Sequence, residues 1–118
     1  MDKKLKESIR ALEHALTFEE KARKDPFYAA GIAKSFETSF EYCWKYFKQR
    51  AISEGFEVFS PREAIKTAGI LKLIDDVEKW MQFQDIRNRA VHDYIGVTDK
   101  EYIETIKTYY REVNLLKL

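Results

Sequence analysis

The sequence is poor in residues that interrupt regular structure: its 118 residues include four glycines, two prolines and a single cysteine. A sheet protein joined by many tight turns needs more glycine and proline, so the composition disfavours that class. One cysteine cannot form an internal disulfide, and we expect Cys43 to be a small buried side chain on a helix.

Long apolar runs are also lacking. None approaches the roughly 18 residues that a membrane-spanning helix needs. The N-terminal stretch "MDKKLKESIR" is charged from its start, unlike a signal peptide. We therefore expect a cytoplasmic protein that does not contact a membrane.

Neither sign of charge is in excess. The sequence has 21 lysines and arginines and 20 aspartates and glutamates, which gives a net charge of +1. A nucleic-acid partner would therefore have to meet a local basic patch. Charged residues make up 35% and hydrophobic residues 45%, which is typical of helices with solvated outer faces around a sizeable core. We expect one domain that spans residues 1–118.

Apolar periodicity and cap residues predict four long helices and one short helix. Their expected bounds are 2–23, 26–53 or 54, 60–69, 75–96 and 98–116. The expected starts are Asp25 with Pro26, Ser60 with Glu63, Asp75 with Glu78 and Thr98 with Glu101, and the expected stops are Gly55, Gly69 and Gly96. Short connections then give an all-α fold, an antiparallel up-and-down four-helix bundle with one extra short helix.

The second helix has the widest apolar face. The residues that form it at helical spacing are Ile32, Phe36, Phe40, Cys43 and Phe47, broadened by Tyr42, Trp44 and Tyr46. Such a face needs cover on more than one side, by bundle neighbours or by a second subunit. His14, by contrast, falls among polar positions of the first helix, where we expect a solvated side chain.

Residues 87–94, "RNRAVHDY", contain the candidate site. His92 can take or give a proton near neutral pH, and Arg87 is a permanent cation shaped to grip phosphate oxygens. Asn88 adds a donor and an acceptor, and Tyr94 follows the histidine by two positions. Together these groups suit cleavage of an RNA phosphodiester by its own 2′-hydroxyl, which needs neither a metal ion nor a cofactor. The alternative is a helix end whose cations only favour the helix dipole.

The spacing of the motif adds a constraint. Positions 87 and 92 lie about 140° apart around an ideal helix, at about 100° per residue. Either the helix is distorted near its end, or His92 works with a group from another chain. A two-fold homodimer would also supply the second imidazole that acid–base cleavage requires.

The motif resembles the R-x4-H-x-Y signature of the HEPN superfamily, in the form found in toxins encoded beside a minimal nucleotidyltransferase (MNT). Upstream, "FETSFEYCWKYFKQ" (36–49) and "SPREAIKTAGILKLIDDVEKW" (60–80) resemble the small helical proteins described as nucleotidyltransferase substrate-binding proteins. The resemblance covers residues from about 28 to 110.

This resemblance implies a homodimeric, metal-independent endoribonuclease toxin and a cognate MNT antitoxin. Arg87 and His92 would be the catalytic pair and Asn88 a supporting polar group, and the antitoxin would silence the toxin by attaching AMP to Tyr94. The body of the chain resembles the substrate-binding branch, in which an aspartate often precedes the motif arginine, whereas Ile86 stands there in this sequence. The motif itself resembles the sister toxin branch.

Two other functions stay open on the sequence alone. One is a non-catalytic subunit that presents a substrate to a separate nucleotidyltransferase, and the other is a structural bundle without chemistry. Lys45, Lys48 and Arg89 are possible contacts to the RNA backbone, although a solvated surface explains them equally well.

Overall fold

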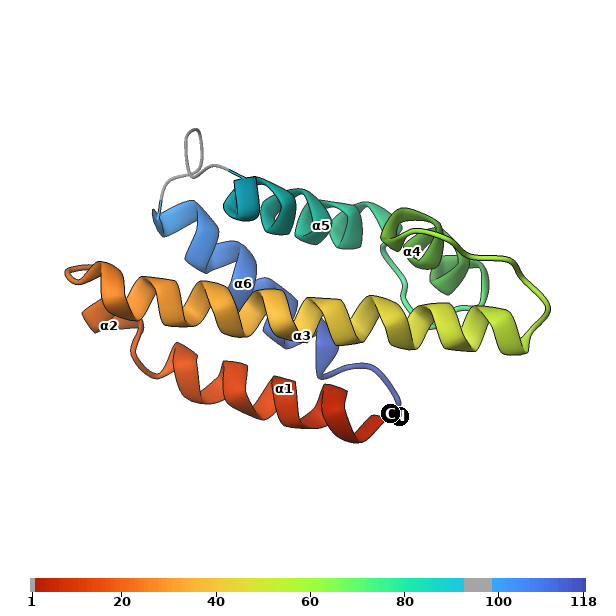
Figure 1. Ribbon diagram of the computed structural model, residues 1–118, viewed down its shortest axis with the longest axis horizontal. Helices are drawn as coiled ribbons and strands as arrows, with labels where there is room; N and C mark the ends of the chain where they lie inside the picture. The colour runs from red at the N-terminus through yellow and green to blue at the C-terminus, as the bar shows by residue number, and fades with distance from the viewer. Residues whose placement is uncertain (1, 93–98) are drawn as a thin grey trace.

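The computed structural model describes residues 2–92 and 99–118, which form six helices and no strand. The helices are α1 (Asp2–Leu16), α2 (Glu19–Ala22), α3 (Pro26–Ser53), α4 (Pro61–Ile70), α5 (Val77–His92) and α6 (Asp99–Val113). Figure 1 shows α1, α3, α5 and α6 packed together, each running against the one before it, with the short α4 at one end. The all-α bundle expected from the sequence is confirmed.

The long helix α3 is the centre of the bundle and contacts each of the other five described helices. Its buried residues are Ile32, Ala33, Phe36, Ser39, Phe40, Cys43, Tyr46, Phe47 and Ala51. Neighbours within the same chain therefore cover most of the wide apolar face, while Tyr42 and Trp44 at its edge stay half-buried. Cys43 is fully buried as expected, and burial raises the pKa of its thiol.

The core between α3, α5 and α6 is built around Tyr109, which is fully buried. Its ring makes edge-to-face contacts with Phe36, Trp80 and Phe83, with centroids 5.2, 5.8 and 5.5 Å apart. Its hydroxyl lies 2.7 Å from the Ser39 hydroxyl, so the buried phenol has a hydrogen-bond partner. Burial raises the pKa of Tyr109 well above its ordinary value.

Several predicted caps are present. The Asp25 side chain accepts the Phe27 N–H at 3.0 Å, and the Ser60 hydroxyl accepts the Glu63 N–H at 3.2 Å. Gly55 follows α3 with a φ of 91°, a left-handed conformation that favours glycine. The start of α3, its end and the start of α4 are therefore confirmed.

The single helix expected over 2–23 is wrong, because the chain turns between α1 and α2. The Thr17 hydroxyl donates to the His14 carbonyl at 2.6 Å, and the Phe18 N–H reaches the Ala15 carbonyl at 3.0 Å. The turn lets the Phe18 ring stack on Tyr28 of α3 at 5.5 Å. A contact with another helix thus overrides the helical pattern of the segment. His14 is exposed as expected.

Three predicted boundaries are also wrong. Helix α6 ends at Val113 and not at residue 116. Asp76, not Asp75, caps α5, since its carboxylate accepts the Lys79 N–H at 3.0 Å. Helix α4 continues past Gly69 to Ile70, and the left-handed residue after it is Lys72, with a φ of 60°. The expected stop at Gly96 and the cap at Thr98 lie outside the described residues.

Gly69 has a packing role instead of a capping role. A Cβ atom at this position would collide with the Cγ2 atom of Val77, the first residue of α5. The absence of a side chain therefore lets α4 and α5 approach each other closely.

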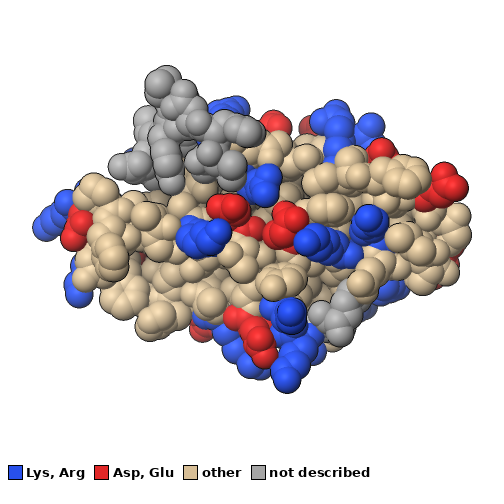
Figure 2. Space-filling view, viewed as in Figure 1, with Lys and Arg blue, Asp and Glu red and all other residues tan. Residues whose placement is uncertain are grey.

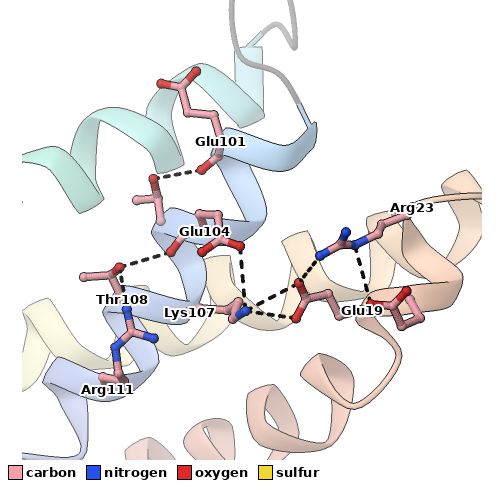
Figure 3. A network of polar contacts seen from close by, with 9 residues as sticks. Glu19, Arg23, Glu101, Glu104, Lys107, Thr108 and Arg111 are labelled. Carbon is pink, nitrogen blue, oxygen red and sulfur yellow. Dashed lines mark hydrogen bonds and ion pairs between the residues drawn. The ribbon is translucent and has the colours of Figure 1, made fainter.

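An ionic network joins α2 to the middle of α6 (Figure 3). The Glu19 carboxylate lies 3.2 Å from the Lys107 ammonium and 3.0 Å from the Arg23 guanidinium. Lys107 also lies 3.7 Å from Glu104 of its own helix. The Arg23 hydrogen bond, assisted by Lys107, lowers the pKa of Glu19 below its usual value. These contacts anchor the part of α6 that follows the candidate motif in sequence.

Within the described residues, no helix is long and apolar enough to cross a membrane.

We predict that Gly69→Ala lowers the free energy of unfolding by roughly 1–3 kcal/mol, because the added methyl group collides with Val77. Gly31→Ala is the matched control, since a Cβ there meets nothing within 4 Å on the exposed face of α3. That control should gain about 0.5–1 kcal/mol from helix propensity. Urea denaturation measures both changes. Adding Val77→Ala should relieve the collision, and equal gains from the two glycine variants would contradict this packing role.

Candidate functional site

Arg87 extends from α5 towards α3, where its guanidinium NH2 lies 3.6 Å from the Glu41 carboxylate. Its NH1 donates to the side-chain oxygen of the adjacent Asn88 at 3.2 Å. The Arg87 side chain is 29% exposed, so one edge of the guanidinium remains accessible to solvent. Its buried Nε atom has no hydrogen-bond partner among the described residues. The fold thus holds the predicted arginine at the surface between two helices.

Glu41 is the residue that sequence reasoning missed. Besides Arg87, its carboxylate accepts the indole N–H of Trp44 at 3.0 Å and lies 3.4 Å from the Lys45 ammonium. The stretch "EYCWK" (41–45) places both of these partners within one turn of Glu41. That spacing is the local signal for this cluster. The link to Arg87, however, crosses between helices and is visible only in the fold.

A pocket of about 270 Å³ opens beside this cluster. Its lining residues are Lys34, Glu37, Thr38, Glu41, Tyr42, Lys45 and Arg87. Figure 2 shows acidic and basic side chains gathered together over the middle of α3, next to α5. Three cations could receive an anionic group such as a phosphate, but the two carboxylates oppose it. An anion must therefore compete with Glu41 for the Arg87 guanidinium.

The predicted supporting residue Asn88 and the three predicted RNA contacts divide into two groups. Lys45 lines the pocket with Arg87, and Asn88 contacts Arg87 directly. Lys48 is half-buried on α3 and is not among the residues that line this pocket. Arg89 is exposed on α5. The structure thus brings Arg87, Asn88 and Lys45 together.

The remaining motif residues are His92, at the end of α5, and Tyr94, beyond it in the sequence. His92 is the last residue of α5, and its side chain is not described. The predicted modification site, Tyr94, lies outside the described residues. The backbone is α-helical from position 87 to position 92. On a regular helix these two positions lie on different faces.

Among the described residues, no group of three or more histidine, cysteine, aspartate or glutamate side chains is arranged to hold a metal ion.

A comparison with protein-family models gives a match over residues 3–118, nearly the whole chain. The matching family is described as "Nucleotidyltransferase substrate binding protein like". No curated protein sequence matches the chain at a significant level.

We predict that Glu41→Gln strengthens binding of pyrophosphate by about three- to tenfold, because the neutral amide no longer competes for the Arg87 guanidinium. The indole N–H signal of Trp44, which donates to Glu41, reports binding in an NMR titration. Glu37→Gln is the matched control, since Glu37 lines the same pocket and its loss changes the charge equally. Equal strengthening by both variants would mean that overall charge, and not the contact with Arg87, governs the pocket.

Proposed function

Because the chain belongs to the nucleotidyltransferase substrate-binding protein-like family, we propose that it works with a nucleotidyltransferase partner and is the ribonuclease of that pair. The observation that carries the proposal is the position of Arg87, partly exposed at a charged pocket on the helix that ends at His92. An arginine fork at a pocket with two lysines suits an RNA phosphate, and the same helix supplies a proton-transfer group.

The proposed reaction is cleavage of the RNA backbone by its own 2′-hydroxyl. One His92 imidazole accepts the 2′-hydroxyl proton as the 2′-oxygen attacks phosphorus. The bond from phosphorus to the 5′-oxygen breaks, and a protonated imidazole gives its proton to this leaving oxygen. The products are a 2′,3′-cyclic phosphate and a free 5′-hydroxyl. Arg87 binds the non-bridging oxygens as negative charge builds on them.

The helical backbone between Arg87 and His92 supports a site shared by two chains. Because positions 87 and 92 lie on different faces of a regular helix, His92 needs a partner group from elsewhere. A homodimer with the ends of its two α5 helices together supplies a second His92 and a second Arg87. One imidazole then acts as the base and the other as the acid.

Control by the partner follows from the chemistry of Tyr94. A minimal nucleotidyltransferase acting as antitoxin transfers AMP from ATP to the Tyr94 hydroxyl. The Tyr94 oxygen forms a bond to the α-phosphorus, the bond between the α- and β-phosphates breaks, and pyrophosphate and the phenol proton are released. The added phosphate brings negative charge and bulk two positions from His92. RNA is then repelled by like charge and excluded by occupancy.

The second candidate is a non-catalytic subunit that presents a substrate to the nucleotidyltransferase. The pairing of Arg87 with Glu41 favours it, because an arginine already neutralised by a carboxylate binds a phosphate less readily. The two functions differ in whether the purified protein cleaves RNA by itself.

We predict that His92→Ala and Arg87→Ala each slow RNA cleavage by roughly 10²–10⁴-fold, the usual loss of a proton-transfer or charge-stabilising group. Cleavage is measured with the purified protein in EDTA, and circular dichroism verifies the helical fold. His14→Ala is the matched control, since His14 is the other histidine of the chain and lies exposed on α1. Undiminished cleavage by His92→Ala would assign the activity to another site, and an inactive wild type would favour the presenting subunit.

We predict that Tyr94→Phe keeps its ribonuclease activity but resists silencing by the nucleotidyltransferase, because the modified hydroxyl is gone. The protein is incubated with the partner and ATP, and intact-mass spectrometry detects the AMP adduct beside the cleavage assay. Tyr42→Phe serves as the control, since Tyr42 lines the pocket of Arg87 and presents another hydroxyl there. A Tyr94→Phe protein that is silenced without an adduct would show that the partner acts by binding alone.

A further inference from the structure

A second pocket, of about 450 Å³, lies between the second half of α3, the linker after α4 and the segment after α6. None of its lining residues also lines the pocket of Arg87. Figure 1 shows α4 at the opposite end of the bundle from the last turn of α5 and the first turn of α6. The second pocket is therefore separate from the proposed ribonuclease site, and the volume falls in the range of small-molecule sites.

Positive charge dominates this second pocket. Its cations are Arg50, Lys72 and Lys117, whereas Asp75 is its one carboxylate among the described residues. None of the three cations has an ion pair with a described residue, in contrast to Arg87 and Lys45 in the first pocket. Three leucines and Tyr46 line the rest of the wall. A guanidinium, two ammonium groups and an apolar wall suit a ligand with a phosphate at one end and an apolar part at the other.

Arg50 is already held in position. Its NH1 group donates to the Tyr46 hydroxyl at 3.2 Å, and Tyr46 is only 5% exposed. The contact fixes one edge of the guanidinium against the core of α3. A donor held in this way loses less freedom when a phosphate binds.

The backbone at Lys72 is an independent observation. After α4, the N–H of Leu73 reaches the carbonyl of Ala68 at 2.9 Å, with Lys72 in the left-handed region. After α3, the N–H of Phe56 reaches the carbonyl of Ala51 at 3.0 Å in the same motif. There the left-handed position is occupied by Gly55, the residue that the conformation favours. The turn after α4 lines the pocket, and its left-handed position is occupied by a lysine although this conformation favours glycine.

We infer that this second pocket binds a phosphorylated small molecule of nucleotide size. Arg50, Lys72 and Lys117 hold the phosphate, and the leucines contact the apolar part. Lys72 is retained in a strained conformation because its ammonium belongs to this site. The inference is independent of RNA cleavage, since it involves none of the residues assigned to that reaction.

The test is an NMR and calorimetric titration of the full chain with AMP, ATP, inorganic phosphate and a short RNA. We expect AMP or ATP to bind more tightly than inorganic phosphate, because phosphate alone gains nothing from the leucines. Lys72→Gly should weaken nucleotide binding by about tenfold, the order of one lost charge-assisted contact. The same variant should raise the melting temperature, because glycine relieves the left-handed backbone. A purely structural lysine would not give both effects.

Matched variants complete the test. Lys66→Gln removes a charge from the exposed face of α4 outside the pocket, so it should leave nucleotide affinity unchanged. Arg50→Gln should weaken binding at least as much as Lys72→Gly. All three variants should keep wild-type ribonuclease activity, which separates a failure here from a failure of the proposed ribonuclease function.

Three results would overturn the inference. One is unaltered nucleotide affinity in Lys72→Gly and Arg50→Gln. Another is equal affinity for AMP and inorganic phosphate, which would leave the leucines without a role. The third is binding of RNA without binding of any nucleotide, which would make the pocket part of an RNA surface.

Discussion

The hydrogen bond between Tyr109 and Ser39 is the constraint on which the arrangement of α3, α5 and α6 depends. A buried phenol without a partner costs roughly 1–3 kcal/mol, so α6 must pack on α3 where the two hydroxyls meet. The observed distance of 2.7 Å satisfies this requirement. The same position packs the Tyr109 ring against Trp80 and Phe83 of α5, which fixes α5 relative to α3. Glu41 lies two residues beyond Ser39, and Arg87 reaches it from α5. The packing of this core thus places α5 beside α3, where Arg87 and Glu41 meet.

The parts of the fold that local chemistry controls could be predicted from the sequence. The caps at Asp25 and Ser60 and the left-handed Gly55 each depend on residues within one helical turn. The break at Thr17 could not be predicted, because its cause is the contact between Phe18 and Tyr28 on another helix. The packing role of Gly69 could not be predicted for a similar reason. A glycine that allows close packing looks the same in sequence as a glycine that ends a helix.

Some residues of the candidate site could likewise be found from the sequence, and others could not. Arg87 stands out in the sequence because a short motif surrounds it, and in the structure it lines a charged pocket, while its catalytic role stays a prediction. Glu41 could not be identified, since its contact with Arg87 joins residues far apart in the chain. The contact changes the physical interpretation of the site. The sequence suggests an unopposed phosphate-binding cation, whereas the fold presents a cation that already has a counter-ion. His92 and Tyr94 remain predictions from the motif.

The two pockets differ in how their charges are compensated, and this difference suits different ligands. Arg87 and Lys45 share the carboxylate of Glu41, so an incoming phosphate exchanges one anion for another. A partly exposed ion pair contributes at most about 1 kcal/mol, so the exchange is not costly, but it yields little net affinity. Such a site suits a long polyanion whose other contacts hold it in place, as the proposed RNA substrate would be held. Arg50, Lys72 and Lys117 form no ion pair with a described residue, and Asp75 is the one described carboxylate that lines the pocket beside them. Three cations against one carboxylate leave a net attraction for a phosphate, and a small ligand with few other contacts needs an attraction of that kind.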